Sequence, residues 1–86
     1  MSERHGESLE DVDIADISPK AWRLLRVAAG YNQRAVEREV DNLMQAHISM
    51  LESGSRGLSQ SRRRALFVLY TAELDDEQVD ALLEHF

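Results

Sequence analysis

Several features are missing from this chain, and each absence narrows what the protein can be. Cysteine is absent, so neither a disulfide nor a thiolate metal site can form. No apolar run is long enough to cross a bilayer, and the acidic start is unlike a secretory signal peptide. We therefore expect a cytoplasmic protein that makes no use of a membrane.

The residue patterns of common enzyme chemistry are also missing. His5, His47 and His85 are far apart, and no His-x3-His pair suited to a metal is present. There is no glycine-rich phosphate loop and no nucleophile elbow. The sequence predicts no catalytic residue, no metal site and no cofactor, so we expect the protein not to be an enzyme.

Lysine is scarce: Lys20 is the only one, beside nine arginines, and 16 acidic residues outnumber ten basic ones. Acidic excess with arginine in place of lysine is typical of a salt-adapted, halophilic cytoplasm, although a GC-rich genome also favours arginine. Such salt would weaken nucleic-acid binding. With about five phosphate contacts, a tenfold rise in salt costs about four to five decades of affinity.

The net charge of −6 is unevenly distributed along the sequence. Residues 1–16 carry −5 and residues 73–86 carry −6, whereas residues 17–72 carry +5. A basic middle between two acidic ends is compatible with a surface that faces phosphates. Ordinary surface patterning is the alternative interpretation.

The 86 residues suit one domain, and an apolar content of 43% is enough for one helical core. Residues 1–16 are acidic and lack a sustained apolar stripe, so we predict a flexible, mostly disordered tail. Residues 17–86 form the predicted domain. Val12, Ile14 and Ile17 could hold the end of the tail against it.

Five helices are expected in residues 17–86. The first starts with serine followed by proline, the usual order at a helix N-terminus, and Trp22 is expected to anchor the core from it. Two short helices follow, separated by a polar break, and the second of them ends at Gly54. The residues predicted to cap helix N-termini are Ser18, Asn32, Ser59 and Asp75.

Residues 25–58 contain the two short helices and the polar break between them. Two short amphipathic helices at a tight corner make a helix-turn-helix, whose second helix can enter a DNA major groove. The segment resembles the helix-turn-helix domain of Cro and phage repressors (the XRE type), and the likeness extends over roughly residues 18–72. The matching positions are Leu25, Arg26, Gly30, Tyr31, Asn32, Gln33, Ile48, Ser49, Leu51, Glu52, Ser53 and Gly54.

This resemblance implies an all-α, five-helix, lambda-repressor-like fold. It also implies a sequence-specific transcriptional regulator, expected to be a repressor, with double-stranded DNA as its partner. Arg26 is then expected to form a partly buried ion pair with Glu52, and Gln33 to meet a backbone phosphate. The second helix of the pair, the recognition helix, would read the bases.

The resemblance also assigns the remaining contacts with DNA. On the recognition helix the implied residues are Gln45, Ala46, His47, Ser49 and Met50, and along the phosphate backbone they are Arg56, Ser59, Arg62 and Arg63. Gln45 could bond adenine, and Ala46 could touch a thymine methyl group. The alternative for His47 is that it only fills the rim of the core. Consecutive helical residues turn by about 100°, so only some of Arg62, Arg63 and Arg64 can face one way.

Four departures from the family pattern leave a second interpretation open. Glu37 stands where the family usually has a small residue, and Asp41 stands where it has a turn glycine. The turn is one residue longer than usual, and no serine or threonine caps the recognition helix, although Asn42 could supply a left-handed turn residue. The chain could therefore be a degenerate helix-turn-helix that serves as a protein-interaction module, antitoxin-like or anti-repressor.

The final segment carries an apolar stripe that reaches the last residue, made of Val79, Leu82, Leu83 and Phe86. Because two-fold repressors bind two half-sites, we predict a homodimer through this stripe. The alternative is that it packs on the domain as a fifth core helix.

Overall fold

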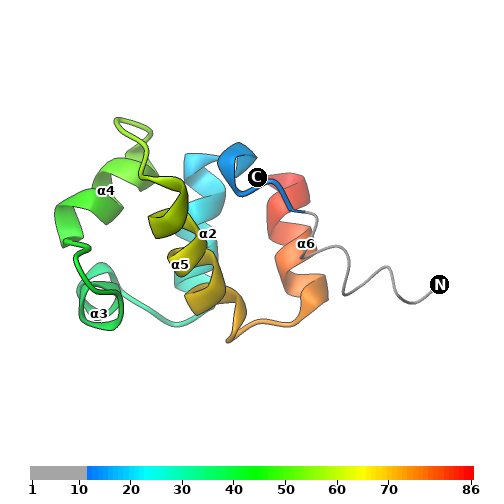
Figure 1. The fold of residues 1–86 in the computed structure, drawn as a ribbon. Helices are drawn as coiled ribbons and strands as arrows, with labels where there is room; N and C mark the ends of the chain where they lie inside the picture. Colours follow the sequence, from blue (N-terminus) through cyan, green and yellow to red (C-terminus); the bar gives the residue numbers. More distant parts are fainter. Residues whose placement is uncertain (1–11) are drawn as a thin grey trace.

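The computed structural model describes residues 12–86, and residues 1–11 lie outside the described part. Its helices are η1 (Ile14–Asp16), α2 (Pro19–Ala28), α3 (Gln33–Glu39), α4 (Gln45–Ser53), α5 (Gln60–Thr71) and α6 (Asp76–His85). The fold is all-α, as predicted: within residues 12–86 there are five α-helices, one 3-10 turn and no strand (Figure 1). None of the described helices is long and apolar enough to span a membrane.

Side-chain caps define where four of the five helices begin. The Ser18 hydroxyl accepts from the backbone N–H of Ala21 at 3.0 Å, and Asn32 Oδ1 accepts from Ala35 at 2.8 Å. The two later helices are capped in the same way, by Ser59 for α5 and by Asp75 for α6. All four predicted N-caps are confirmed, because a cap depends on local sequence alone.

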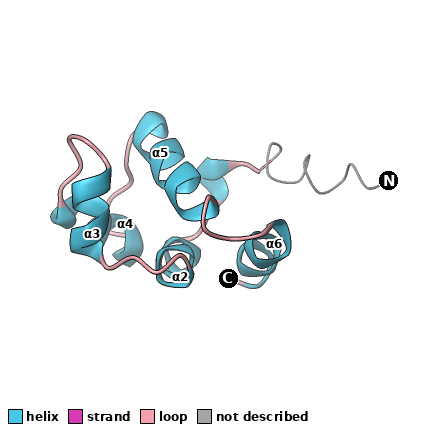
Figure 2. Cartoon of the chain, turned by 90° about the horizontal axis from the view of Figure 1, so that it is seen from below, coloured by secondary structure: helices cyan, strands magenta, loops and turns pink. Residues whose placement is uncertain are grey.

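The core is centred on α2, which packs against α4, α5 and α6 (Figure 2). Trp22 and Leu25 are almost completely buried there, as the predicted anchor role of Trp22 requires. The Trp22 and Tyr70 rings meet edge to face, with their centroids 6.4 Å apart. The other buried apolar side chains are Ile14, Ala21, Val36, Leu43, Ile48, Leu51, Leu66, Phe67 and Val79.

The domain begins earlier than residue 17, which corrects the predicted boundary. Asp13 caps the short turn η1, which packs against α5, and Ile14 is buried in the core. Residues 12–16 are therefore part of the fold. The remainder of the predicted tail, residues 1–11, lies outside the described residues.

Helix α6 packs on α2 of its own chain, so the apolar stripe is largely used internally. Val79 is fully buried, and Leu82 and Leu83 pack against the core. The Phe86 ring stays 47% exposed, while its carbonyl accepts from the Ser18 hydroxyl at 2.5 Å. The assignment of Val79 to a dimer interface is therefore wrong, because α2 already covers that side chain.

The connection from α3 to α4 explains how the longer turn is accommodated. Asn42 takes the left-handed backbone conformation, with φ of 62°, as its position suggested. Leu43 is buried beneath the turn and ties it to the core. At the far end of α4, Gly54 has φ of 79° and ends the helix as predicted.

Candidate nucleic-acid interface

Helix α4 presents one face to the core and the other to solvent. Ile48 and Leu51 are buried, which fixes the rotation of the helix about its axis. The opposite face carries Gln45, Ala46 and Ser49, all exposed. Three of the five residues predicted to read bases are therefore accessible together, whereas Met50 and His47 lie half-buried at the side.

The N-terminus of α4 is capped by side chains that the sequence did not identify as caps. Glu37, on α3, accepts from the backbone N–H of Gln45 through Oε2 at 3.0 Å. His47 Nδ1 accepts from the backbone N–H of Met44 at 3.1 Å. This bond assigns the ring proton of a neutral His47 to Nε2. Glu37 departs from the pattern of the Cro and phage-repressor resemblance, and it supplies the cap that this pattern would take from a serine or threonine.

The predicted ion pair between Arg26 and Glu52 is present and bidentate. Arg26 Nε donates to Glu52 Oε2 at 2.7 Å, and Nη2 donates to Oε1 at 3.0 Å. Nη1 donates to the carbonyl of Tyr31 at 2.9 Å. The two side chains are only 11% and 6% exposed. The hydrogen bond to Glu52 raises the pKa of Arg26 above its usual value, against the opposing effect of burial. The ion pair joins α2 to α4.

Gln33 extends this pair to the start of α4. Its Nε2 donates to Glu52 Oε1 at 3.2 Å, and its Oε1 accepts from Gln45 Nε2 at 3.3 Å. Each amide has two donor hydrogens and an oxygen with two lone pairs, so both retain free capacity. The structure shows that Gln33 positions Gln45, and its predicted contact with a phosphate stays a prediction.

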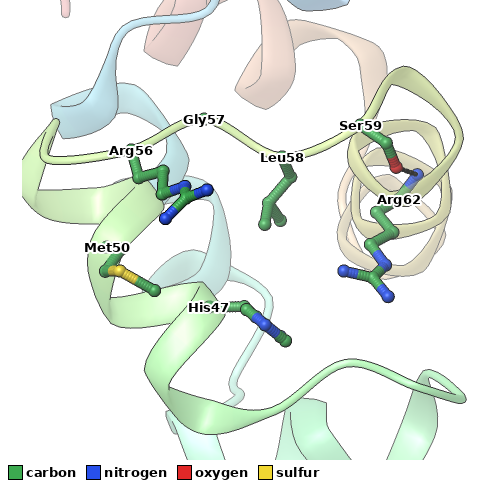
Figure 3. A pocket seen from close by; sticks show the side chains of 7 residues that line it. All are labelled: His47, Met50, Arg56, Gly57, Leu58, Ser59 and Arg62. Atoms are coloured by element: carbon green, nitrogen blue, oxygen red, sulfur yellow. Dashed lines mark hydrogen bonds between the residues drawn. The ribbon is translucent and has the colours of Figure 1, made fainter.

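Beside α4 lies an open groove of about 330 Å³, bounded on its other side by the start of α5. Figure 3 shows the Arg56 and Arg62 guanidinium groups approaching it from opposite sides, with the His47 ring below them. Ser59 lies at its edge, where its hydroxyl caps α5. The full lining is His47, Met50, Arg56, Gly57, Leu58, Ser59 and Arg62. Five of the residues assigned to DNA from the sequence thus come together here: His47, Met50, Arg56, Ser59 and Arg62.

Arg63 does not line this groove, although it directly follows Arg62, and its contact with DNA stays a prediction. It lines a separate cavity of about 160 Å³ together with Trp22 and Leu51, and its Nε is buried without a hydrogen-bond partner among the described residues. The helical turn between neighbours is the reason, as expected for the arginine triplet. Arg64 is exposed on yet another side of α5.

The donor set of the groove suits an anion. Within residues 12–86, no three histidine, cysteine, aspartate or glutamate side chains are grouped as metal ligands. The groove instead offers two guanidinium groups, a hydroxyl and an imidazole. Guanidinium groups match phosphate oxygens in charge and geometry.

These features define a small all-α domain in which two short helices and an arginine-lined groove share one end. The chain belongs to the family described as Domain of unknown function (DUF8599), which matches residues 11–63. That range contains η1, α2, α3, α4 and the first residues of α5, and hence both the Arg26–Glu52 pair and Arg62. No curated protein and no solved structure matches the chain.

Proposed function

We propose that this protein is a sequence-specific, double-stranded-DNA-binding regulator of transcription of the Cro and phage-repressor type, acting in the cytoplasm. One observation carries the proposal: the exposed face of α4 adjoins the groove that holds Arg56 and Arg62. His47 and Met50 belong to α4 and also line the groove. A helix inserted in a major groove would therefore carry the arginines to the adjacent backbone.

The exposed face of α4 would contact the bases, and the groove with Arg56 and Arg62 would contact the backbone. Gln45 can offer an amide to adenine, and Ala46 a methyl group to thymine. Arg56 and Arg62 can pair with phosphate oxygens, and Ser59 lies where the free N–H groups of α5 favour an anion. Repression would follow from occupying a promoter.

The distribution of charge in space supports this reading. The acidic helix α6 lies at the opposite end of the molecule from α4 (Figure 1), along the longest dimension of 41 Å. Salt screens exposed charges beyond about 10 Å at 0.1 M. The carboxylates of α6 would therefore oppose binding at α4 only weakly.

Titration of the purified protein against its own upstream DNA over a range of salt tests the proposal. We expect saturable binding that survives competitor DNA, with an affinity that falls as salt rises. Arg62→Gln should weaken binding and reduce the salt slope by about one. Arg23→Gln is the matched control, because Arg23 is an exposed arginine on α2 that does not line the groove.

A folded, helical protein that binds no DNA at low salt would overturn the proposal. It would favour the second candidate, a protein-interaction module of antitoxin-like or anti-repressor type. Two observations favour that candidate: α4 carries no lysine or arginine, and the Glu37 carboxylate lies at its N-terminus. A carboxylate there repels phosphates that approach the recognition helix.

A further inference from the structure

A second groove lies away from Arg56 and Arg62, between α5 and the end of α3. It has a volume of about 480 Å³ and is lined by Val40, Ala65, Val68 and Leu69, with Glu39 and Asp41 at its edge. Val68 is 59% exposed, although valine is most often found buried. The described chain therefore leaves an apolar groove uncovered on a surface otherwise rich in charge.

The sequence of α5 explains why this face is free. Leu66, Phe67 and Tyr70 fill the core side of the helix. Ala65 and Val68 lie on the other side, three residues apart, and are short enough for another helix to approach closely. The exposed face of α5 is thus suited to packing rather than to solvation.

Charges of both signs flank this apolar face. Because helical residues turn by about 100°, Arg64 and Leu69 lie on opposite sides of Val68. Glu39 and Asp41 line the groove together with Leu69, so the carboxylates and the Arg64 guanidinium occupy opposite edges. None of these three side chains forms a hydrogen bond or ion pair within residues 12–86.

We propose that a second copy of this chain occupies the groove, forming a two-fold dimer across α5. A two-fold axis that runs along α5, between these two edges, places Arg64 of each copy against the acidic edge of the other. Val68 of each copy then enters the other's apolar groove. A partner of different sequence would need a patch with the same arrangement of charge, which this chain already has.

The apolar part of the interface comprises four side chains, less than the core of a large obligate interface. The dimer is therefore a weak one that depends on protein concentration. It does not require DNA, so it can be tested even if the proposed function fails. The interface also replaces the predicted dimer through α6, where Val79 is already covered.

Sedimentation equilibrium of the full chain without DNA, over a wide concentration range, is the test. The wild type should pass from monomer to dimer as concentration rises, and Val68→Asp should remain a monomer. Val27→Asp is the matched control, because Val27 is a similarly exposed valine, at 52%, on α2. Far-UV circular dichroism should show both variants as helical as the wild type.

A charge exchange tests the pairing itself. Arg64→Glu alone should weaken the dimer at least tenfold, and so should Glu39→Lys combined with Asp41→Lys, because each brings like charges together. Mixing these two proteins should restore a heterodimer, since every edge then meets its opposite. A monomeric wild type, dimers in Val68→Asp equal to those of Val27→Asp, or no recovery on mixing would each overturn the proposal.

Discussion

Glu37 on α3 accepts a hydrogen bond from the backbone N–H of Gln45, the first residue of α4, at 3.0 Å. The first N–H groups of a helix have no partner within it, and a carboxylate there also interacts favourably with the helix dipole. Glu37 therefore stabilises the start of α4. In the proposed complex the same charge would lie close to DNA phosphates, so it would favour folding and oppose binding.

This dual role predicts opposite effects on stability and on affinity. Glu37→Gln keeps an acceptor for Gln45 but removes the charge, so we expect a loss of stability of about 0.3–1 kcal/mol. Glu37→Ala removes the cap as well and should cost about 0.5–2 kcal/mol. Urea denaturation measures both values.

The same Glu37→Gln variant should bind upstream DNA more tightly than the wild type, most clearly at low salt. Glu77→Gln serves as the control, because Glu77 is an exposed carboxylate on α6, at the other end of the molecule from α4. Equal affinities for wild type and Glu37→Gln would mean that α4 does not approach phosphates from its N-terminus.

The Arg26–Glu52 pair predicts a larger loss of stability. Either Arg26→Met or Glu52→Met leaves the other charge largely buried without its partner, which costs about 3–5 kcal/mol. Because the pair is partly exposed, we expect the lower end of that range, a fall in Tm of about 12 °C or more. Calorimetry checks this, and the double variant should lose less than the sum of the single ones. Single variants that melt within a degree of wild type would refute it.

Replacing Arg63, unlike replacing Arg26, should cost little stability. The Arg63 Nε is buried beside Trp22 without a hydrogen-bond partner among the described residues. Replacing an unpaired buried polar group by an apolar one of similar shape is often neutral or stabilising. Arg63→Met should therefore melt close to wild type, in contrast to Arg26→Met. Arg63→Met should also leave the salt slope of DNA binding nearly unchanged, unlike Arg62→Gln. A lowered slope would mean that Arg63 contacts a phosphate.

Local features of the fold were predictable from the sequence. Ser18, Asn32, Ser59 and Asp75 cap the helices that they precede, because an N-cap bonds to a backbone N–H only a few residues away. The Arg26–Glu52 pair was also foreseen, but through the family resemblance, since its partners are 26 residues apart.

Features that depend on three-dimensional packing were not predictable in this way. The cap on α4 comes from Glu37, eight residues before Gln45, and only the bend between the helices brings them together. The periodicity of α6 showed an apolar stripe, but not whether α2 or a second copy covers Val79. The arginine triplet showed charge, but the rotation of α5 decides that Arg62 lines the groove and Arg63 does not.

Tyr70 predicts how stability changes at alkaline pH. Burial first, and then the nearby Glu52 carboxylate, raise the pKa of Tyr70 above its usual value near 10. Above about pH 10 the unfolded chain loses this proton while the folded chain keeps it, so stability falls as pH rises, by up to about 1.4 kcal/mol per unit. Urea denaturation between about pH 9 and pH 11 measures the slope. Tyr70→Phe keeps the ring against Trp22 and removes the ionisable group, so its slope should be shallower. An equal decline in both proteins would show that other groups cause the alkaline loss of stability.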